Sequence, residues 1–110
     1  VKFLRPDIRV IGVDPEEAAS MQAAIAAGHP VALDQVGLFA DGVAVRQVGT
    51  ETFRICRELL DDIVTVTADE ICAAIKDIFD DHRAIAEPAG ALALAGLRRR
   101  SSGAWRRPAR

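Results

Sequence analysis

The chain has 110 residues, of which 50% are apolar and 27% charged, and its formal net charge is −2. That length allows one domain or a piece of one, and that apolar content excludes a disordered chain. No apolar run approaches the roughly 20 residues that cross a membrane, and the first ten residues lack the continuous apolar core of a secretory signal.

The first part of the chain predicts a strand followed by a helix. Residues 8–14 are rich in β-branched side chains and predict a buried strand. Proline and glutamate then begin a helix over residues 15–27, which Gly28 ends. Asp14 follows the strand at its carboxyl end, where α/β folds place ligands. We prefer the simpler interpretation of an acid that stabilises the helix N-terminus.

Residues 34–49 have no helical period and predict a loop with a short extended piece around Val43–Val45. Within it, residues 39–42 (FADG) form a turn. Gly42 admits two interpretations: its backbone approaches a flat ligand closely, or it only completes a tight turn.

The second half alternates helices and a strand. A helix is expected over residues 50–62, a strand over 62–67 and a helix over 68–82. Thr67 and Glu70 have the spacing of a capping box, in which each side chain satisfies a free backbone N–H. The chain therefore has too few strands for a stable open sheet, and we expect it to be part of a larger α/β domain.

Glu87 is the only acid in the apolar stretch between Arg83 and Leu97. Pro88 predicts a helix start, and a carboxylate beside it is stabilised by the helix dipole and by N–H groups. Alternatively, the small residues 89–91 leave this start open to a partner helix or a planar cofactor. The residues alone do not favour either interpretation. The helix that follows is expected to be buried on most sides.

The last thirteen residues differ in charge from the rest. Residues 98–110 carry 6 arginines and no acid, whereas residues 1–97 carry 8 basic and 16 acidic side chains. We therefore divide the chain at residue 98 and expect the tail to be disordered. The acidic body is a poor match for nucleic acid, but the tail permits an alternative function: a non-enzymatic α/β binding or interaction module that docks on RNA or acidic surfaces.

The remaining reactive side chains are isolated. Cys56 and Cys72 lie in helical patterns and are expected to be packed core thiols in a reducing cytoplasm. His29 is expected in a turn and His82 at a helix end, so neither predicts a metal site or an acid/base pair.

Three stretches carry a resemblance to a known family: VIGVDPEEAASMQAAIAAGHPV, VGLFADGVAVRQVGTETFRICRELLDDIVTV and DEICAAIKDIFDDHRAIAEPAGALALAG. From about Ile8 to Leu97 the chain resembles the biosynthetic threonine dehydratases (threonine ammonia-lyases). Their relatives, the serine dehydratases and racemases, share only ADGV and the EP.AG pattern.

The resemblance implies an α/β fold: a three-layer fragment of a fold-type-II pyridoxal phosphate enzyme, similar to the β subunit of tryptophan synthase, with a few parallel strands flanked by helices. Residues 1–97 would be the C-terminal portion of its catalytic domain. The family converts threonine to 2-oxobutanoate and ammonia, which is the first step toward isoleucine. It implies an amino-acid substrate, a cytoplasmic homo-oligomer and no nucleic-acid or membrane partner. It also implies cofactor contacts from Glu87, Gly42 and Asp41.

Several parts of the family's site are expected upstream of this chain: the Schiff-base lysine, an asparagine and a phosphate-binding loop. Lys2 and Lys76 are the only lysines and lie outside the family's catalytic context. We therefore expect no catalytic residue here and no activity from the chain alone, unless a separate chain supplies the lysine.

Two family features are not transferred. Racemase-like relatives hold a divalent ion with an acid, a backbone carbonyl and a second acid, at positions that match Asp14, Ala18 and Ser20, but serine replaces the second acid here. We therefore expect no metal. The tail departs from the family, whose SGAN motif comes later in the chain, so its pyridine-binding role is not carried over to Ser102. We attribute this departure to a shift of reading frame or to the end of a gene fragment.

Overall fold

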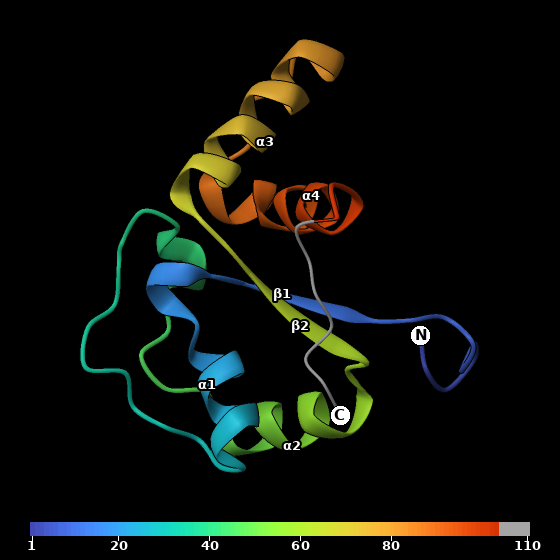
Figure 1. Cartoon of the computed structure of the whole chain (residues 1–110), viewed down its shortest axis with the longest axis vertical. Coiled ribbons are helices and arrows are strands. Elements are labelled where there is room, and N and C mark those ends of the chain that lie inside the picture. Colours follow the sequence, from blue (N-terminus) through green and yellow to red (C-terminus); the bar gives the residue numbers. More distant parts are fainter. Residues whose placement is uncertain (104–110) are drawn as a thin grey trace.

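The structure is a computed structural model that describes residues 1–103 (Figure 1). In chain order its elements are β1 (Ile11–Pro15), the 3-10 turn η1 (Glu16–Ala18), α1 (Ser20–Ala27), the 3-10 turn η2 (Asp41–Val43), α2 (Thr50–Leu59), β2 (Asp62–Val66), α3 (Ala68–His82) and α4 (Pro88–Ser101).

The two strands form a parallel sheet between two layers of helices. Val13 pairs with Val64, and Pro15, at the end of β1, pairs with Val66 at the end of β2. Helices α1 and α2 cover one face, while α3 and α4 cover the other (Figure 1). A parallel pair needs a crossover connection, which the chain between β1 and β2 provides. The predicted α/β fold with parallel strands flanked by helices is confirmed.

Each face of the sheet has its own apolar core. On the α1–α2 side, the buried residues are Ala24, Val48 and Phe53. On the α3–α4 side, they are Ala40, Val66, Ile71, Ala74, Ala91, Leu92 and Ala95. The second cluster includes one residue of the 34–49 loop, Ala40, which brings that loop to the carboxyl end of β2.

Helix α3 has the bounds that the sequence predicts, because its start is specified locally. The Thr67 hydroxyl accepts the Glu70 N–H at 3.2 Å, and the Glu70 carboxylate accepts the Thr67 N–H at 2.8 Å. This confirms the capping box.

The start of α1 differs from its prediction. A 3-10 turn occupies residues 16–18, and α1 begins only at Ser20. The Asp14 carboxylate accepts the N–H of Gln22 at 2.9 Å. This bond satisfies a free amide in the first turn of a helix that starts at Ser20, as an N-terminal acid does.

The extended piece predicted around Val43–Val45 is wrong. Residues 41–43 form η2, and Val45 donates its N–H to the Val43 carbonyl at 2.9 Å. Val43 packs against the core cluster that contains Ala40, so its apolar side chain serves a turn and not a strand.

Helix α4 does not end at the predicted boundary. It continues through Arg98, Arg99 and Arg100 to Ser101, where disorder was expected. Residues 104–110 of the expected tail lie outside the described residues. Burial of α4 is one-sided: Ala91, Leu92, Ala95 and Gly96 are buried, whereas Leu97 is exposed.

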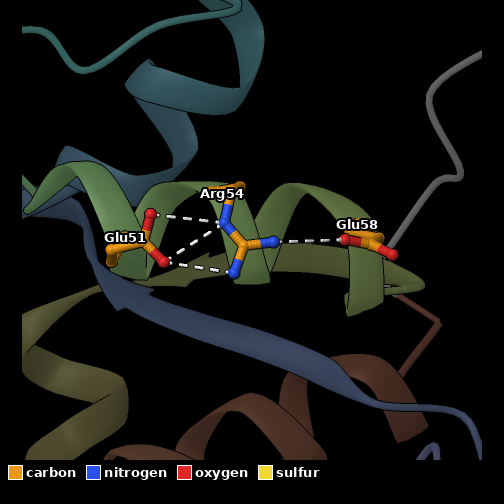
Figure 2. A network of polar contacts seen from close by, with 3 residues as sticks. All are labelled: Glu51, Arg54 and Glu58. Carbon is orange, nitrogen blue, oxygen red and sulfur yellow. Dashed lines mark hydrogen bonds and ion pairs between the residues drawn. The ribbon is translucent and has the colours of Figure 1, made fainter.

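The outer face of α2 carries a charged network. Arg54 donates to Glu51 at 3.1 Å and lies 3.8 Å from a carboxylate oxygen of Glu58 (Figure 2). All three side chains are well exposed, so this network contributes little to stability. Within residues 1–103, no helix is long and apolar enough to cross a membrane.

Candidate functional site

The carboxyl ends of the strands bring together two segments that the sequence analysis singled out. The turn η2 contacts α4, and Ala40, just before η2, shares a core cluster with Val66 at the end of β2. Figure 1 shows η2, the start of α3 and α4 on this side of the sheet. The carboxyl edge of a parallel sheet is where α/β folds bind ligands.

Gly42 and Glu87 lie next to each other at this edge. A Cβ added to Gly42 would lie 3.0 Å from the Cβ of Ala89 and 3.7 Å from Oε1 of Glu87. Among the glycines of residues 1–103, only Gly28 and Gly103 have a positive φ. A tight turn therefore does not require glycine at position 42. Its small size serves the close approach of η2 to the start of α4.

Asp41 holds the turn that carries Gly42. Its Oδ1 accepts the Gly42 N–H at 3.0 Å, and its carbonyl accepts the Ala44 N–H at 3.1 Å. The side chain is exposed. The geometry thus gives Asp41 a role in fixing the turn.

Glu87 is the N-cap residue of α4, with Pro88 at the first helical position. Its carboxylate makes no side-chain capping hydrogen bond, so the capping interpretation fails in its specific form. The carboxylate is exposed and lies on the side of Gly42. An acceptor group thus lies beside bare backbone at the start of a helix with small side chains.

Asp14 is a structural acid. It accepts N–H bonds from Gln22 and Met21, as expected for a residue that stabilises the start of α1. Burial raises the pKa of its carboxyl, and the two backbone bonds only partly offset that effect. Within residues 1–103, no group of three or more His, Cys, Asp or Glu residues is arranged to hold a metal ion.

Neither lysine lies at this site. The Lys2 ammonium pairs with Asp61 at 2.5 Å, next to the amino end of β2. Lys76 lies on the exposed side of α3, where hydrogen bonding to Asp80 raises the pKa of its amine. A Schiff-base lysine needs the opposite shift, toward the neutral amine. The residues present can face a planar cofactor but cannot attach it covalently.

The other candidates occupy structural positions. Nδ1 of His29 lies 2.9 Å from the Pro30 carbonyl in the turn after α1, and His82 ends α3. Cys56 is partly buried, but Cys72 is exposed, contrary to the expectation of a core thiol. Because Ile71 faces the core, its neighbour in the helix points away from it.

Sequence reasoning missed two features. Ala89 is in the closest contact of the site, but nothing in its local pattern indicates this. The first two arginines of the tail pair with acids of α3: Arg99 donates to Glu70 at 2.8 Å, and Arg98 pairs with Asp77. The one available signal was the acidic face of α3, where Glu70 and Asp77 are two helical turns apart.

The comparisons agree on one family. The model of pyridoxal-phosphate dependent enzymes matches residues 1–110. The biosynthetic L-threonine dehydratase of Escherichia coli is 61% identical over 99 residues, which are 90% of this chain and 19% of that protein. The chloroplastic biosynthetic threonine dehydratase of Arabidopsis thaliana is 58% identical over 96 residues, which are 87% of this chain and 16% of that protein.

A solved structure gives the same result. The processed form of threonine deaminase isoform 2 from Solanum lycopersicum matches with a TM-score of 0.85 and 50% identity, over 86% of this chain and 28% of that one. The chain therefore spans about a fifth of the length of the curated relatives it matches.

Proposed function

Because this chain belongs to the pyridoxal-phosphate dependent enzymes, we propose that it forms part of a threonine dehydratase and supplies Gly42, Asp41 and Glu87 to the cofactor site. One observation carries the proposal. Gly42 is bare backbone without a positive φ, and it lies against Glu87 and Ala89 at the carboxyl edge of the sheet.

Each residue has a separate task. The backbone at Gly42 offers a flat surface with no side chain, Asp41 fixes the turn, and Glu87 provides an acceptor oxygen beside it. Pyridoxal phosphate, when bound, supplies the electron sink for negative charge on the substrate carbon. The residues of this chain would contact the cofactor from one side and orient it there.

The covalent part of the chemistry requires an amine from outside this chain. Both lysines are engaged in ion pairs away from Gly42 and Glu87. We expect these 110 residues alone to form no 2-oxobutanoate from threonine, and we expect activity only when residues beyond them supply the lysine. The substrate assignment follows from the two threonine dehydratases that the chain resembles. We extend the proposal to a step in isoleucine biosynthesis, a cytoplasmic location and assembly as a homo-oligomer.

The alternative of an interaction module with a basic tail finds less support. Arg98 and Arg99 pair with Asp77 and Glu70, so two of the six arginines of residues 98–110 serve the packing of α4 on α3. A phosphate backbone would have to compete with these acids.

A chimera tests the role of the site. The matched 99 residues of the Escherichia coli dehydratase are replaced by those of this chain. Glu87→Ala and Gly42→Val are then compared with the unmodified chimera by the absorbance of bound pyridoxal phosphate. We expect each substitution to weaken cofactor binding or change the absorbance maximum, because one removes the acceptor and the other pushes the turn η2 away from the start of α4.

Gly49→Ala is the matched control. Gly49 is the N-cap of α2, where an added Cβ has its nearest contact at 3.6 Å, from the Thr52 hydroxyl. It adds a methyl group to a glycine on the opposite face of the sheet. If Glu87→Ala and Gly42→Val match this control in folding, affinity and spectrum, the proposed cofactor contacts are wrong.

A further inference from the structure

The turn that carries Gly42 is fixed by backbone hydrogen bonds and by packing on the core cluster. Val43 donates its N–H to the Ala40 carbonyl at 3.0 Å, and Ala44 donates to the Asp41 carbonyl at 3.1 Å. Ala40 is buried, and Val43 packs against the same core cluster. The turn therefore has little freedom to move away from α4.

The start of α4 is fixed by the packing of this helix in the core and on β1. Ala91 is completely buried and donates its N–H to the Glu87 carbonyl at 3.1 Å. One turn and a half further along, Gly96 packs so closely on β1 that an added Cβ would lie 2.5 Å from a methyl carbon of Val13. The helix therefore cannot retreat from the sheet or from η2 without breaking core contacts.

The Ala89 methyl group is the nearest group of α4 to a Cβ built at Gly42, at 3.0 Å, and Oε1 of Glu87 follows at 3.7 Å. We propose that the methyl group of Ala89 is a spacer that fixes the distance between η2 and the first turn of α4, and that Ala89 is thereby a positioning residue for the Glu87 carboxylate. At 3.0 Å, a methyl group at position 42 would force the Ala89 methyl to move by a few tenths of an ångström, whereas a smaller residue at 89 leaves a gap.

The role of Ala89 rests on the proposed function, because a fixed Glu87 matters only if this carboxylate faces a ligand. The contact itself does not depend on that function. It distinguishes Ala89 from the adjacent Gly90, where an added Cβ would have nothing closer than 3.6 Å. A methyl group at position 90 would make only an ordinary van der Waals contact, whereas one at position 42 would crowd the Ala89 methyl.

A double-mutant cycle on the full 110-residue chain tests the contact. Gly42→Ala is expected to lower the melting temperature by about 4–8 °C, the shift that one kilocalorie produces in a domain of this size. Ala89→Gly alone is expected to lower the melting temperature, because glycine is unfavourable in a helix. Since it also removes the methyl group that a Cβ at position 42 would meet, the double mutant is expected to lose less than the sum of the two single losses. Gly90→Ala, the matched control, is expected to leave the melting temperature unchanged or raise it.

The position of Glu87 needs a second measurement, because the melting temperature does not report on it. In isotope-labelled chain, the backbone amide and carboxyl carbon signals of Glu87 are followed by NMR. Ala89→Gly adds no atom, so it should fold. It is expected to shift or broaden the Glu87 signals, whereas Ala89→Ser retains the Cβ and is expected to restore them to their original positions.

The outcomes separate clearly. Two results together support the proposal. The double mutant loses less melting temperature than the sum of the two single losses, and the Glu87 signals change when the Cβ of residue 89 is removed and return when it is restored. Additive melting temperatures, or Glu87 signals that ignore both substitutions at 89, overturn it. If Gly42→Ala does not fold, Ala89→Gly and Ala89→Ser decide alone. No cofactor is present, so failure here leaves the dehydratase assignment untouched, and failure of the chimera leaves the contact untouched.

Discussion

Asp14 shows at the residue scale how one carboxylate is stabilising through its hydrogen bonds and costly through its burial. It accepts the Gln22 N–H at 2.9 Å, while burial raises its pKa. We expect Asp14→Ala to cost about 1 kcal/mol, because an amide of α1 loses its acceptor. Asp14→Asn keeps an acceptor oxygen and removes the charge, so it should cost less. Urea unfolding of the three chains measures the difference.

The pH dependence of Asp14 has a definite sign. Its pKa is higher in the folded chain, so the folded chain binds this proton more tightly, and its contribution to stability falls as the pH rises through the folded pKa. The stability of Asp14→Asn relative to the wild type should therefore increase from the ordinary Asp pKa of about 3.9 upward and then level off. A fall in the stability of Asp14→Asn relative to the wild type over this range would show that the pKa is not raised.

Single residues of the site were predictable in kind but not in arrangement. Gly42 and Glu87 were candidates because a glycine in a polar turn and an isolated acid before a proline are visible in the sequence. The sequence left both glycine interpretations open because φ and the approach of α4 are tertiary properties. Ala89 was missed for the same reason, since an alanine in an alanine-rich helix carries no local signal.

At the scale of elements, the contact of α4 with β1 depends on a missing side chain. A Cβ at Gly96 would lie 2.5 Å from Val13 Cγ2. We expect Gly96→Ala to destabilise the chain by about 1–3 kcal/mol through overpacking. The same change at Gly90, in the same helix, is expected to be neutral or stabilising by up to about 1 kcal/mol. Thermal unfolding compares the two, and equal effects would contradict the close packing of α4 on β1.

The pairing of α4 with α3 gives a second prediction. The side chains of Arg99 and Glu70 are 31% and 34% exposed, whereas that of Arg54, on the outer face of α2, is 60% exposed. We expect Arg99→Ala to cost about 0.5–1 kcal/mol and Arg54→Ala less than about 0.5 kcal/mol. Chemical denaturation of both variants measures these costs, and a larger effect at Arg54 would contradict the assignment.

Acid should weaken the Arg99–Glu70 pair. Partial burial alone would raise the pKa of Glu70, but the Thr67 N–H and the Arg99 guanidinium outweigh it, and the pKa is lowered. The stabilisation is therefore present above the unfolded pKa and is lost as the pH falls through the folded one. The difference between Arg99→Ala and wild type should shrink below the ordinary Glu pKa of about 4.3.

Elements specified by neighbouring residues were predicted well, and those that depend on distant residues were not. The bounds of α3 follow from its capping box and its apolar stripe, which are local in sequence. The continuation of α4 to Ser101 depends on acids of α3 that are distant in sequence. Arg98 pairs with an acid 21 positions away, and Arg99 with one 29 positions away. Composition alone had suggested a boundary at residue 98.

At the scale of the whole molecule, the sheet is incomplete within residues 1–103. It has two strands, and large apolar side chains are exposed, among them Leu38, Ile85 and Leu97. The sequence predicted this, because two strands cannot bury a parallel sheet. It could not give the layer arrangement in detail, which follows from how α4 packs on both strands.

The rate of 2-oxobutanoate formation by the chimera of this chain with the Escherichia coli dehydratase tests the central claim most directly. If residues of this chain build one side of a threonine dehydratase site, the chimera should convert threonine at a rate within about tenfold of the parent enzyme, since about 1.4 kcal/mol of lost stabilisation gives that factor. Glu87→Ala should reduce the rate well below that of the Gly49→Ala control. A folded chimera that holds pyridoxal phosphate but does not convert threonine would contradict the assignment.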